Sequence, residues 1–312
     1  MLKTKAILLG KVETAYSVDA GPVGANAILC EDVQITPITK ALERANVRPT
    51  FGAKSKLVVG EGLKLTFTTE LRSTGVAPVV AAPDIGVLFR GCNFTQTIVS
   101  TAGSECCKYN PHSEQVGESI TLWFYLDGLL FKAVGCRGTG ALNCKTNEYG
   151  KLSWEFTGIF AGPETGVAPT PVFSAALPPV FKGAQFAIDG YAAVIDTLKI
   201  NMGNTIAKRT DANAATGILS WDIVDRAVTG EIDPEVPALA EKDFWAMWQD
   251  AETVALTATI GQAAGDRCII TSPAVQIDDL SFGDREQILT YGLPLRIKPT
   301  DAGNDEIEFK FN

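Results

Sequence analysis

The chain has 312 residues, a length that fits about two domains at ~150 residues each. Hydrophobic residues make up 46% of it and charged residues 20%, which excludes a disordered, collagen-like or coiled-coil protein. The net charge of −9 has the wrong sign for a protein that grips nucleic-acid phosphates by releasing counterions. A single histidine, His112, excludes polyhistidine metal sites and leaves few possible Ser-His or Cys-His catalytic pairs.

The negative charge is concentrated in the second half of the sequence. Residues 1–165 carry 16 basic and 15 acidic side chains, a net of +1, whereas residues 166–312 carry 11 basic and 21 acidic side chains, a net of −10. Such a concentration of negative charge either keeps the protein soluble or disfavours binding of particular partners to that half.

Neither a secretory signal nor a membrane span is expected. The apolar run at residues 6–9 is shorter than a signal peptide needs, and the apolar region 75–89 is interrupted by Pro78, Pro83 and Asp84. We therefore expect a protein that is soluble and intracellular when made.

The seven cysteines form an odd set without regular spacing, which predicts free thiols rather than a disulfide framework. Cys106, Cys107 and His112 could be combined with Cys136 or Cys144 as zinc ligands. Adjacent cysteines do not easily face one ion, however, and no paired C-x-x-C spacing is present. We expect no metal and no other cofactor.

Alternation of apolar and polar residues is the main structural signal in the first half. It is clearest at residues 63–72, where one face of an antiparallel strand would lie on a core. The elements predicted there are strands at residues 28–36, 63–72, 120–126, 129–136 and 152–161, and short helices at 38–45 and 84–92.

A loop-rich stretch with glycine and proline, residues 162–179, separates these elements from a second strand-rich half. An apolar stripe formed by Ala240, Phe244, Met247 and Ala251 predicts an amphipathic helix in the second half. The elements predicted there are strands at residues 194–201, 221–232, 253–260, 267–277, 287–298 and 306–311, and a helix at 237–251. The shared order of elements indicates a tandem duplication with a boundary after residue 165.

Common catalytic signatures are absent from the sequence. It contains no G-x-S-x-G elbow, no G-x-x-x-x-G-K-[ST] phosphate loop and no H-E-x-x-H motif. The glycines of residues 135–140 predict a turn, and the acidic residues 301–306 predict a polar loop without the full calcium-binding pattern. We expect no enzyme, although two distant carboxylates that meet in a cleft remain an alternative.

Short stretches along nearly the whole chain share an order with one protein family. They lie at residues 11–16, 35–37, 83–92, 109–113, 125–128, 135–138, 200–204, 224–230 and 304–309. Taken in this order, they resemble the tail tube (major tail) protein of long-tailed bacteriophages, in its tandem two-domain form.

The resemblance implies a mainly β fold of two tandem tail-tube-like β-sandwich or barrel domains, each with a flanking α-helix. The first domain, with an N-terminal arm, would span residues 1–165, and the second, strongly acidic domain would span 166–312. Rings in this family usually contain six such domains, so three copies of a two-domain chain would close a pseudo-hexameric ring.

The same resemblance implies a structural virion protein whose rings stack into the tail tube, the conduit for genome ejection. Its partners would be other copies of itself and the tape measure, tail terminator and baseplate or distal tail proteins. Genomic DNA would pass through the lumen without specific binding, and no membrane would be involved. The protein would be assembled in the host cytoplasm and would reside in the virion tail.

Ring stacking in the family implies contacts from Pro37–Gly62, from the arm Met1–Asn26 and from Asn204–Ser220. The first segment has suitable chemistry, since it offers both apolar side chains and charges for pairing. Its candidate contact residues are Ile38, Lys40, Leu42, Glu43, Arg44 and Arg48.

An acidic lumen would let DNA slide, because a basic wall would hold its phosphates. We hypothesise that the second half supplies much of this charge. The candidates are Asp222, Asp225, Glu231, Asp278, Asp279, Glu306 and Glu308.

Two other functions remain open on the sequence alone. One is another ring-forming structural protein, such as a baseplate or tail completion ring or a type VI secretion tube. A secretion tube protein is generally about half this length, so the apparent duplication favours a phage tube. The other is a two-domain β-sandwich that binds a ligand, for which an exposed aromatic platform would be expected.

Overall fold

The computed structural model describes residues 5–114 and 117–312. In this part of the chain the regular structure is almost entirely β, with a 3-10 turn η1 (Gly24–Asn26) and two short helices, α1 (Gly86–Gly91) and α2 (Phe244–Gln249). The strands are β1 (Ala6–Val12), β2 (Ala27–Ile28), β3 (Glu31–Glu43), β4 (Lys56–Glu70), β5 (Phe94–Val99), β6 (Cys106–Pro111), β7 (Ile120–Leu126), β8 (Leu129–Lys145), β9 (Lys151–Thr165), β10 (Ala187–Ile188), β11 (Thr197–Asn201), β12 (Asn204–Thr210), β13 (Ile218–Arg226), β14 (Thr229–Ile232), β15 (Val254–Ile260), β16 (Cys268–Ile277), β17 (Ser281–Arg285), β18 (Ile288–Ile297) and β19 (Glu308–Phe311). The predicted mainly β class is confirmed, and no helix in the described residues is long and apolar enough to cross a membrane.

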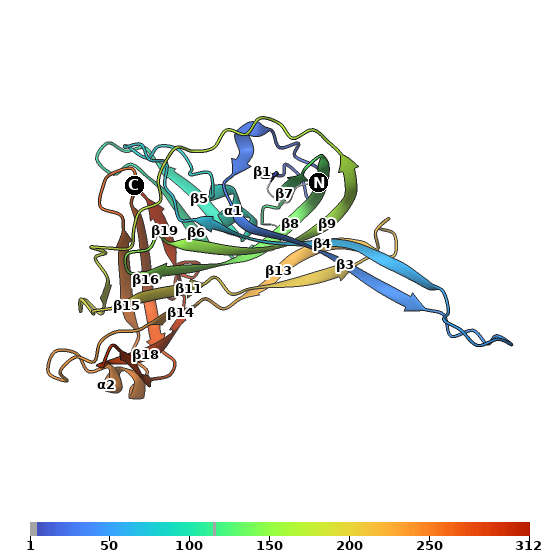
Figure 1. Ribbon diagram of the computed structural model, residues 1–312. Helices are drawn as coiled ribbons and strands as arrows, with labels where there is room; N and C mark the ends of the chain where they lie inside the picture. Colours follow the sequence, from blue (N-terminus) through green and yellow to red (C-terminus); the bar gives the residue numbers. More distant parts are fainter. Residues whose placement is uncertain (1–4, 115–116) are drawn as a thin grey trace.

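The first half of the chain forms a curved antiparallel sheet in which β1, β7, β8, β9, β4 and β3 lie side by side (Figure 1). Strands β7 and β8 are joined by the tight turn Asp127-Gly128, where both residues have positive φ, as a two-residue hairpin requires. β1 takes up residues 6–12 of the expected N-terminal arm. This part of the arm is therefore committed to the sheet.

Strand β8 connects the two halves of the molecule. Its first part pairs with β7, and its last part pairs with β11, from Ala141↔Asn201 to Lys145↔Thr197. From β11 the sheet continues through β14 and β18 to β16 and β15. The last strand, β19, pairs on one side with β16 and on the other with β6 of the first half. The predicted boundary after residue 165 therefore lies within one hydrogen-bonded sheet, and it stays a prediction.

The buried core also crosses from one half to the other. Phe89 of α1 is fully buried, and its ring lies 4.9 Å from that of Tyr109, 5.3 Å from Trp154 and 5.0 Å from Phe309, centroid to centroid. Aromatic pairs in this range add attraction beyond the area they bury. Helix α1 thus packs between strands of the first half and the C-terminal strand.

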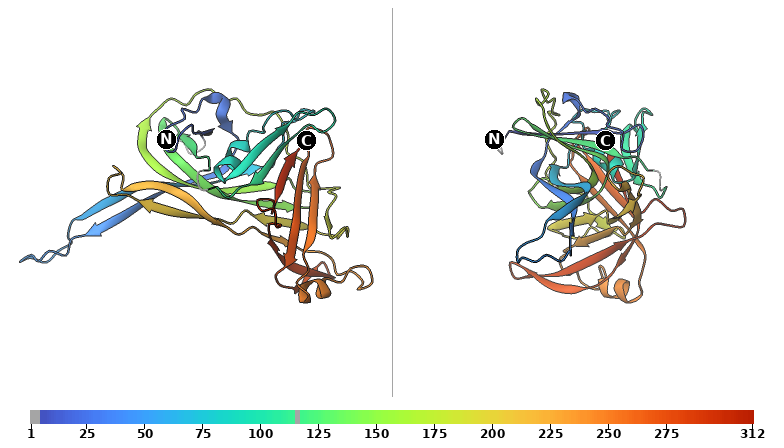
Figure 2. Two further views of the ribbon diagram at one scale, coloured as in Figure 1. Left: turned by 180° about the vertical axis from the view of Figure 1, so that it is seen from behind. Right: turned by 90° about the vertical axis from the view of Figure 1, so that its right-hand side faces the viewer.

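The β3–β4 hairpin projects far beyond the body of the protein (Figures 1 and 2). Only its base is covered: β4 pairs with β9 from Glu70 to Gly62, and the remaining hairpin pairs only with itself. The β12–β13 hairpin runs beneath this base, where Trp221 lies against Gly62. A Cβ atom at Gly62 would stand 3.1 Å from the Trp221 ring, which explains a small residue there.

The helix predicted at 38–45 is wrong, because residues up to Glu43 belong to β3. Cross-strand pairs such as Leu42↔Leu57 hold this segment extended, and pairing with a distant strand overrides a local helical pattern. The helix predicted at 84–92 is confirmed by α1.

The helix predicted at 237–251 is shorter than expected. It begins after Asp243, whose side chain accepts a hydrogen bond from the Ala246 N–H, and ends at Gln249. The positive φ of Ala251 prevents a further turn. The strand predicted at 221–232 is divided into β13 and β14 by Ala227 and Val228, which lie in neither strand.

Candidate assembly surfaces

The six candidate contact residues all lie on the projecting hairpin. Four of them belong to β3, whereas Arg44 and Arg48 lie in the connection that forms the tip. Ile38 is half-buried at the base, and the other five are exposed. The structure therefore brings together Ile38, Lys40, Leu42, Glu43, Arg44 and Arg48 on one solvated element. Their role in contacts between copies stays a prediction.

Apolar residues on the same hairpin were missed by the sequence reasoning. Val47 and Phe51 in the tip are essentially fully exposed, at 98% and 108%. Leu57, Val58 and Val59 of β4 are exposed by 58%, 60% and 42%. Three consecutive apolar residues in a strand indicate that both of its faces are buried. This pattern could have identified residues 57–59 as contact candidates. In the isolated chain neither face of the distal hairpin is covered.

The third expected stacking segment, residues 204–220, forms β12, the connection 211–217 and the start of β13. Its base is anchored by Asn204, whose side-chain amide donates to the carbonyls of Cys92 and Gly138 at 2.8 and 2.9 Å. This end of the hairpin is consequently fixed to the first half. The connection is exposed at most of its positions.

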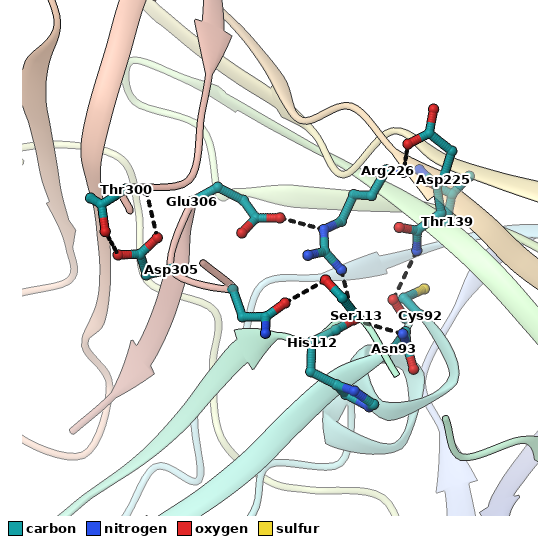
Figure 3. Close-up of polar contacts among 12 residues, drawn as sticks. Cys92, Asn93, His112, Ser113, Thr139, Asp225, Arg226, Thr300, Asp305 and Glu306 are labelled. Atoms are coloured by element: carbon teal, nitrogen blue, oxygen red, sulfur yellow. Dashed lines mark hydrogen bonds and ion pairs between the residues drawn. The ribbon is translucent and has the colours of Figure 1, made fainter. Parts of the chain in front are cut away.

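A polar network joins the first half to the last strands (Figure 3). Arg226 of β13 donates through Nε to the buried carboxylate of Glu306 at 2.5 Å, and through Nη1 to the carbonyl of His112 at 3.0 Å. The side chain of Asn93 donates to the same carbonyl at 2.7 Å. Beside them the Ser113 hydroxyl donates to Asn304 at 2.5 Å. These bonds link β13, the residues that follow β6 and the segment before β19.

Two of the candidate lumen carboxylates are largely neutralised by arginine. Glu306 is only 5% exposed and is paired with Arg226. Asp222 is paired with the buried Arg137 at 2.8 Å and with Arg209 at 3.3 Å. Carboxylates in such pairs contribute little to the field of a lumen.

The other five candidates are more accessible. Glu231 and Asp278 form surface ion pairs with Lys199 and Arg296, and the half-buried Glu308 is paired with Lys108. Asp225 and Asp279 are exposed, and each accepts a hydrogen bond from the backbone N–H of the next residue. Whether any of these residues faces a lumen stays a prediction.

A second buried ion pair holds α1 in place. Arg72 has a side chain that is only 2% exposed and lies 2.6 Å from Asp84, just before α1. Burial raises the pKa of Asp84, and the Arg72 charge only partly offsets this effect. The pair therefore joins the end of β4 to the helix that plugs the core.

The seven cysteines are free thiols in the structure, six of them buried and Cys30 half-buried. Burial raises the pKa of Cys92, Cys136 and Cys268 well above the usual value and that of Cys30 to about 12. These four thiols are therefore protonated at neutral pH and are poor nucleophiles. Within residues 5–114 and 117–312, no group of three or more His, Cys, Asp or Glu side chains is placed to hold a metal ion.

These observations define a mainly β protein whose most prominent solvated element is a hairpin with uncovered apolar side chains. The chain matches the model of a protein family described as phage tail tube protein over residues 4–308. It belongs to that family, as the sequence resemblance predicts, and is a structural component of a bacteriophage tail. A search of curated proteins found no match.

Proposed function

We propose that this chain polymerises into stacked rings that form the tail tube and conduct genomic DNA into the host during ejection. Three copies form each ring, because each chain contributes two tube domains to a pseudo-hexameric arrangement. The tube assembles in the host cytoplasm. It is in contact with the tape measure, tail terminator and baseplate or distal tail proteins.

The observation that carries this proposal is the β3–β4 hairpin. A projecting hairpin with both faces solvated, and with Val47 and Phe51 fully exposed, is unfavourable in an isolated chain. Burial of one such side chain contributes roughly 1.5–3 kcal/mol. Contact with a neighbouring copy provides that burial, and the same contact repeated along an axis produces a tube.

Exposed strand edges support the ring. β3 pairs with β4 alone among the described residues, so its other edge is open. An uncovered edge of this length promotes aggregation of a monomer, whereas a closed ring uses it to pair with the next subunit. The excess of acidic side chains in the second half suits a lumen through which DNA slides.

Removal of the distal hairpin tests this proposal. Ala41 and Val58 face each other across the two strands, so residues 42–57 can be replaced by Asn-Gly without changing the register below. We expect the truncated chain to keep the circular dichroism spectrum and melting temperature of the native chain but to form no rings or tubes in negative-stain microscopy and sedimentation.

A matched control shortens another exposed connection, residues 100–104 between β5 and β6, in the same way. This variant should polymerise as the native chain does. The proposal fails if the native chain stays monomeric at high concentration with and without an initiating tail protein, or if hairpin truncation leaves polymerisation unchanged.

A further inference from the structure

The tip of the hairpin is both apolar and basic. Residues 40–56 carry five basic side chains and one acidic side chain, a net of +4, in a chain whose overall charge is −9. The exposed Val47 and Phe51 lie within this segment. A partner for the tip therefore has to offer an apolar surface surrounded by negative charge.

One surface at the other end of the molecule has this character. Phe282 of β17 and Leu289 of β18 are exposed by 60% and 51%. The ring of Phe282 lies 6.0 Å from Trp245 of α2, which in turn lies 5.9 Å from Trp248. Because Phe282 is opposite Tyr291 and Asp284 is opposite Leu289, these four side chains share one face of the β17–β18 hairpin. We call this surface, with α2 and its flanking residues, the aromatic patch.

Acidic side chains surround the aromatic patch. Residues 239–253 and 278–289 together carry eight acidic and two basic side chains, a net of −6. Both basic residues are engaged locally, since Lys242 pairs with Asp189 and Arg285 pairs with Asp233 at 2.9 Å. The negative charge of Asp279, Asp284 and Glu286 remains available to a partner. The acids are Glu241, Asp243, Asp250, Glu252, Asp278, Asp279, Asp284 and Glu286.

The tip and the patch lie at opposite ends of the chain (Figures 1 and 2). The tip points away from α2 and β18, so it does not reach the patch of its own chain. Complementary surfaces at opposite ends of one subunit form a head-to-tail contact, which generates a repeating assembly rather than a closed pair.

We propose that the aromatic patch of one copy is the docking site for the β3–β4 hairpin tip of a second copy. The apolar tip residues cover Phe282 and Leu289, and the basic residues of the tip approach the surrounding acids. This inference rests on the proposed function, because it names the surface that receives the hairpin in the stacked tube.

Charge reversal in full-length chains tests the pairing. A tip variant carries Arg44→Glu and Arg48→Glu, and a patch variant carries Asp279→Lys and Glu286→Lys. Each variant alone places like charges together, so we expect the concentration needed for polymerisation to rise about tenfold or more. A chain with all four reversals restores opposite charges and should polymerise within about threefold of the native chain.

Asp301→Lys provides a control, because this exposed residue lies in the β18–β19 connection, at the other end of β18 from the patch. This control should polymerise as the native chain does. Circular dichroism and melting temperature establish that each variant is folded, and sedimentation velocity with electron microscopy measures assembly.

The outcomes separate this inference from the proposed function. If the tip variant fails to polymerise and the fourfold reversal does not rescue it, the tip docks elsewhere, and the inference is overturned while tube formation stands. The same conclusion follows if both twofold variants polymerise normally. If the native chain forms no assembly under any condition, both the inference and the proposed function are overturned.

Discussion

Arg72 and Asp84 illustrate how single residues hold the structure together. The Arg72 side chain is almost completely buried, and its Nη2 lies 2.6 Å from the Asp84 carboxylate. Substitution of Arg72 by Met leaves this largely buried carboxylate, 15% exposed, without its cation. Loss of one partner of a buried pair costs about 3–5 kcal/mol, and we expect a decrease of this size in the free energy of unfolding measured with urea.

Lys199 provides a contrast, because its pair with Glu231 is exposed on both sides, at 47% and 51%. The Lys199→Met variant should lose less than ~1 kcal/mol. Equal losses for Arg72→Met and Lys199→Met would show that the buried pair does not anchor α1.

His112 predicts a pH dependence that can be assigned to one residue, since the chain has no other histidine. Burial lowers its pKa below the usual 6.5, Arg226 lowers it further, and Glu114 and Glu118 oppose both effects. The unfolded chain therefore binds more protons than the folded chain below pH 6.5. Stability from this residue is present above that pH and is lost as the pH falls.

The measurement is the free energy of unfolding of the native chain and of His112→Gln from pH 7.5 to pH 5. The native chain should lose more stability than the variant over this interval. Parallel curves for the two proteins would contradict the assignment to His112.

At the scale of elements, a tight connection between β11 and β12 positions the second hairpin. Gly203 has a φ of +63°, and a Cβ atom there would stand 1.9 Å from the carbonyl oxygen of Ala227. The Gly203→Ala variant should therefore lose several kcal/mol, because backbone atoms have to move. Denaturant unfolding with circular dichroism measures this loss.

Gly190 provides the control for Gly203, because an alanine there would meet the same backbone conformation without a steric clash. It has a similar φ of +70°, but nothing lies within 4 Å of the position of its Cβ. The Gly190→Ala variant should cost only about 1 kcal/mol. If the two variants were equally destabilised, contact with Ala227 would not be the reason for the glycine.

The strands predicted best from the sequence were those with a strong pattern. Residues 120–126 match β7 at both ends, and the alternation of 253–260 corresponds closely to β15. Strands β1, β5, β6, β10, β12 and β17 were missed. Of these strands, β6 pairs with the distant β19, and such long-range pairing is not visible in the local sequence pattern. β5 and β17 pair with the strands that follow them, but their own apolar alternation is too weak to predict a strand.

The projecting hairpin shows the same limit. Its six candidate contact residues were predicted by a family resemblance and do lie together. The local pattern did not predict that residues 38–43 pair with β4. It did not predict the exposure of Phe51 either, because this exposure arises only when the hairpin extends beyond the body of the protein.

At the scale of the whole molecule, the sheet that runs through both halves affects what can fold alone. A fragment of residues 1–165 would lose β11 from the edge of β8 and β19 from the edge of β6, and would expose Phe89 where Phe309 covers it. We expect this fragment to aggregate or remain partly unfolded when expressed alone. Co-expression with residues 166–312 should give a soluble complex.

This experiment is read by size-exclusion chromatography and near-ultraviolet circular dichroism. A fragment 1–165 that is monomeric and shows cooperative thermal unfolding would demonstrate that the first half folds independently. The expected boundary after residue 165 would then mark a true division between domains.

Cryo-electron microscopy of the polymer formed by the purified full-length chain tests the central claim most directly. We predict a hollow tube of stacked rings, each with three chains arranged with pseudo-sixfold symmetry and with the β3–β4 hairpin of each chain in contact with the neighbouring ring. A chain that remains dispersed as monomers, or a ring in which this hairpin is free in solvent, would contradict the account.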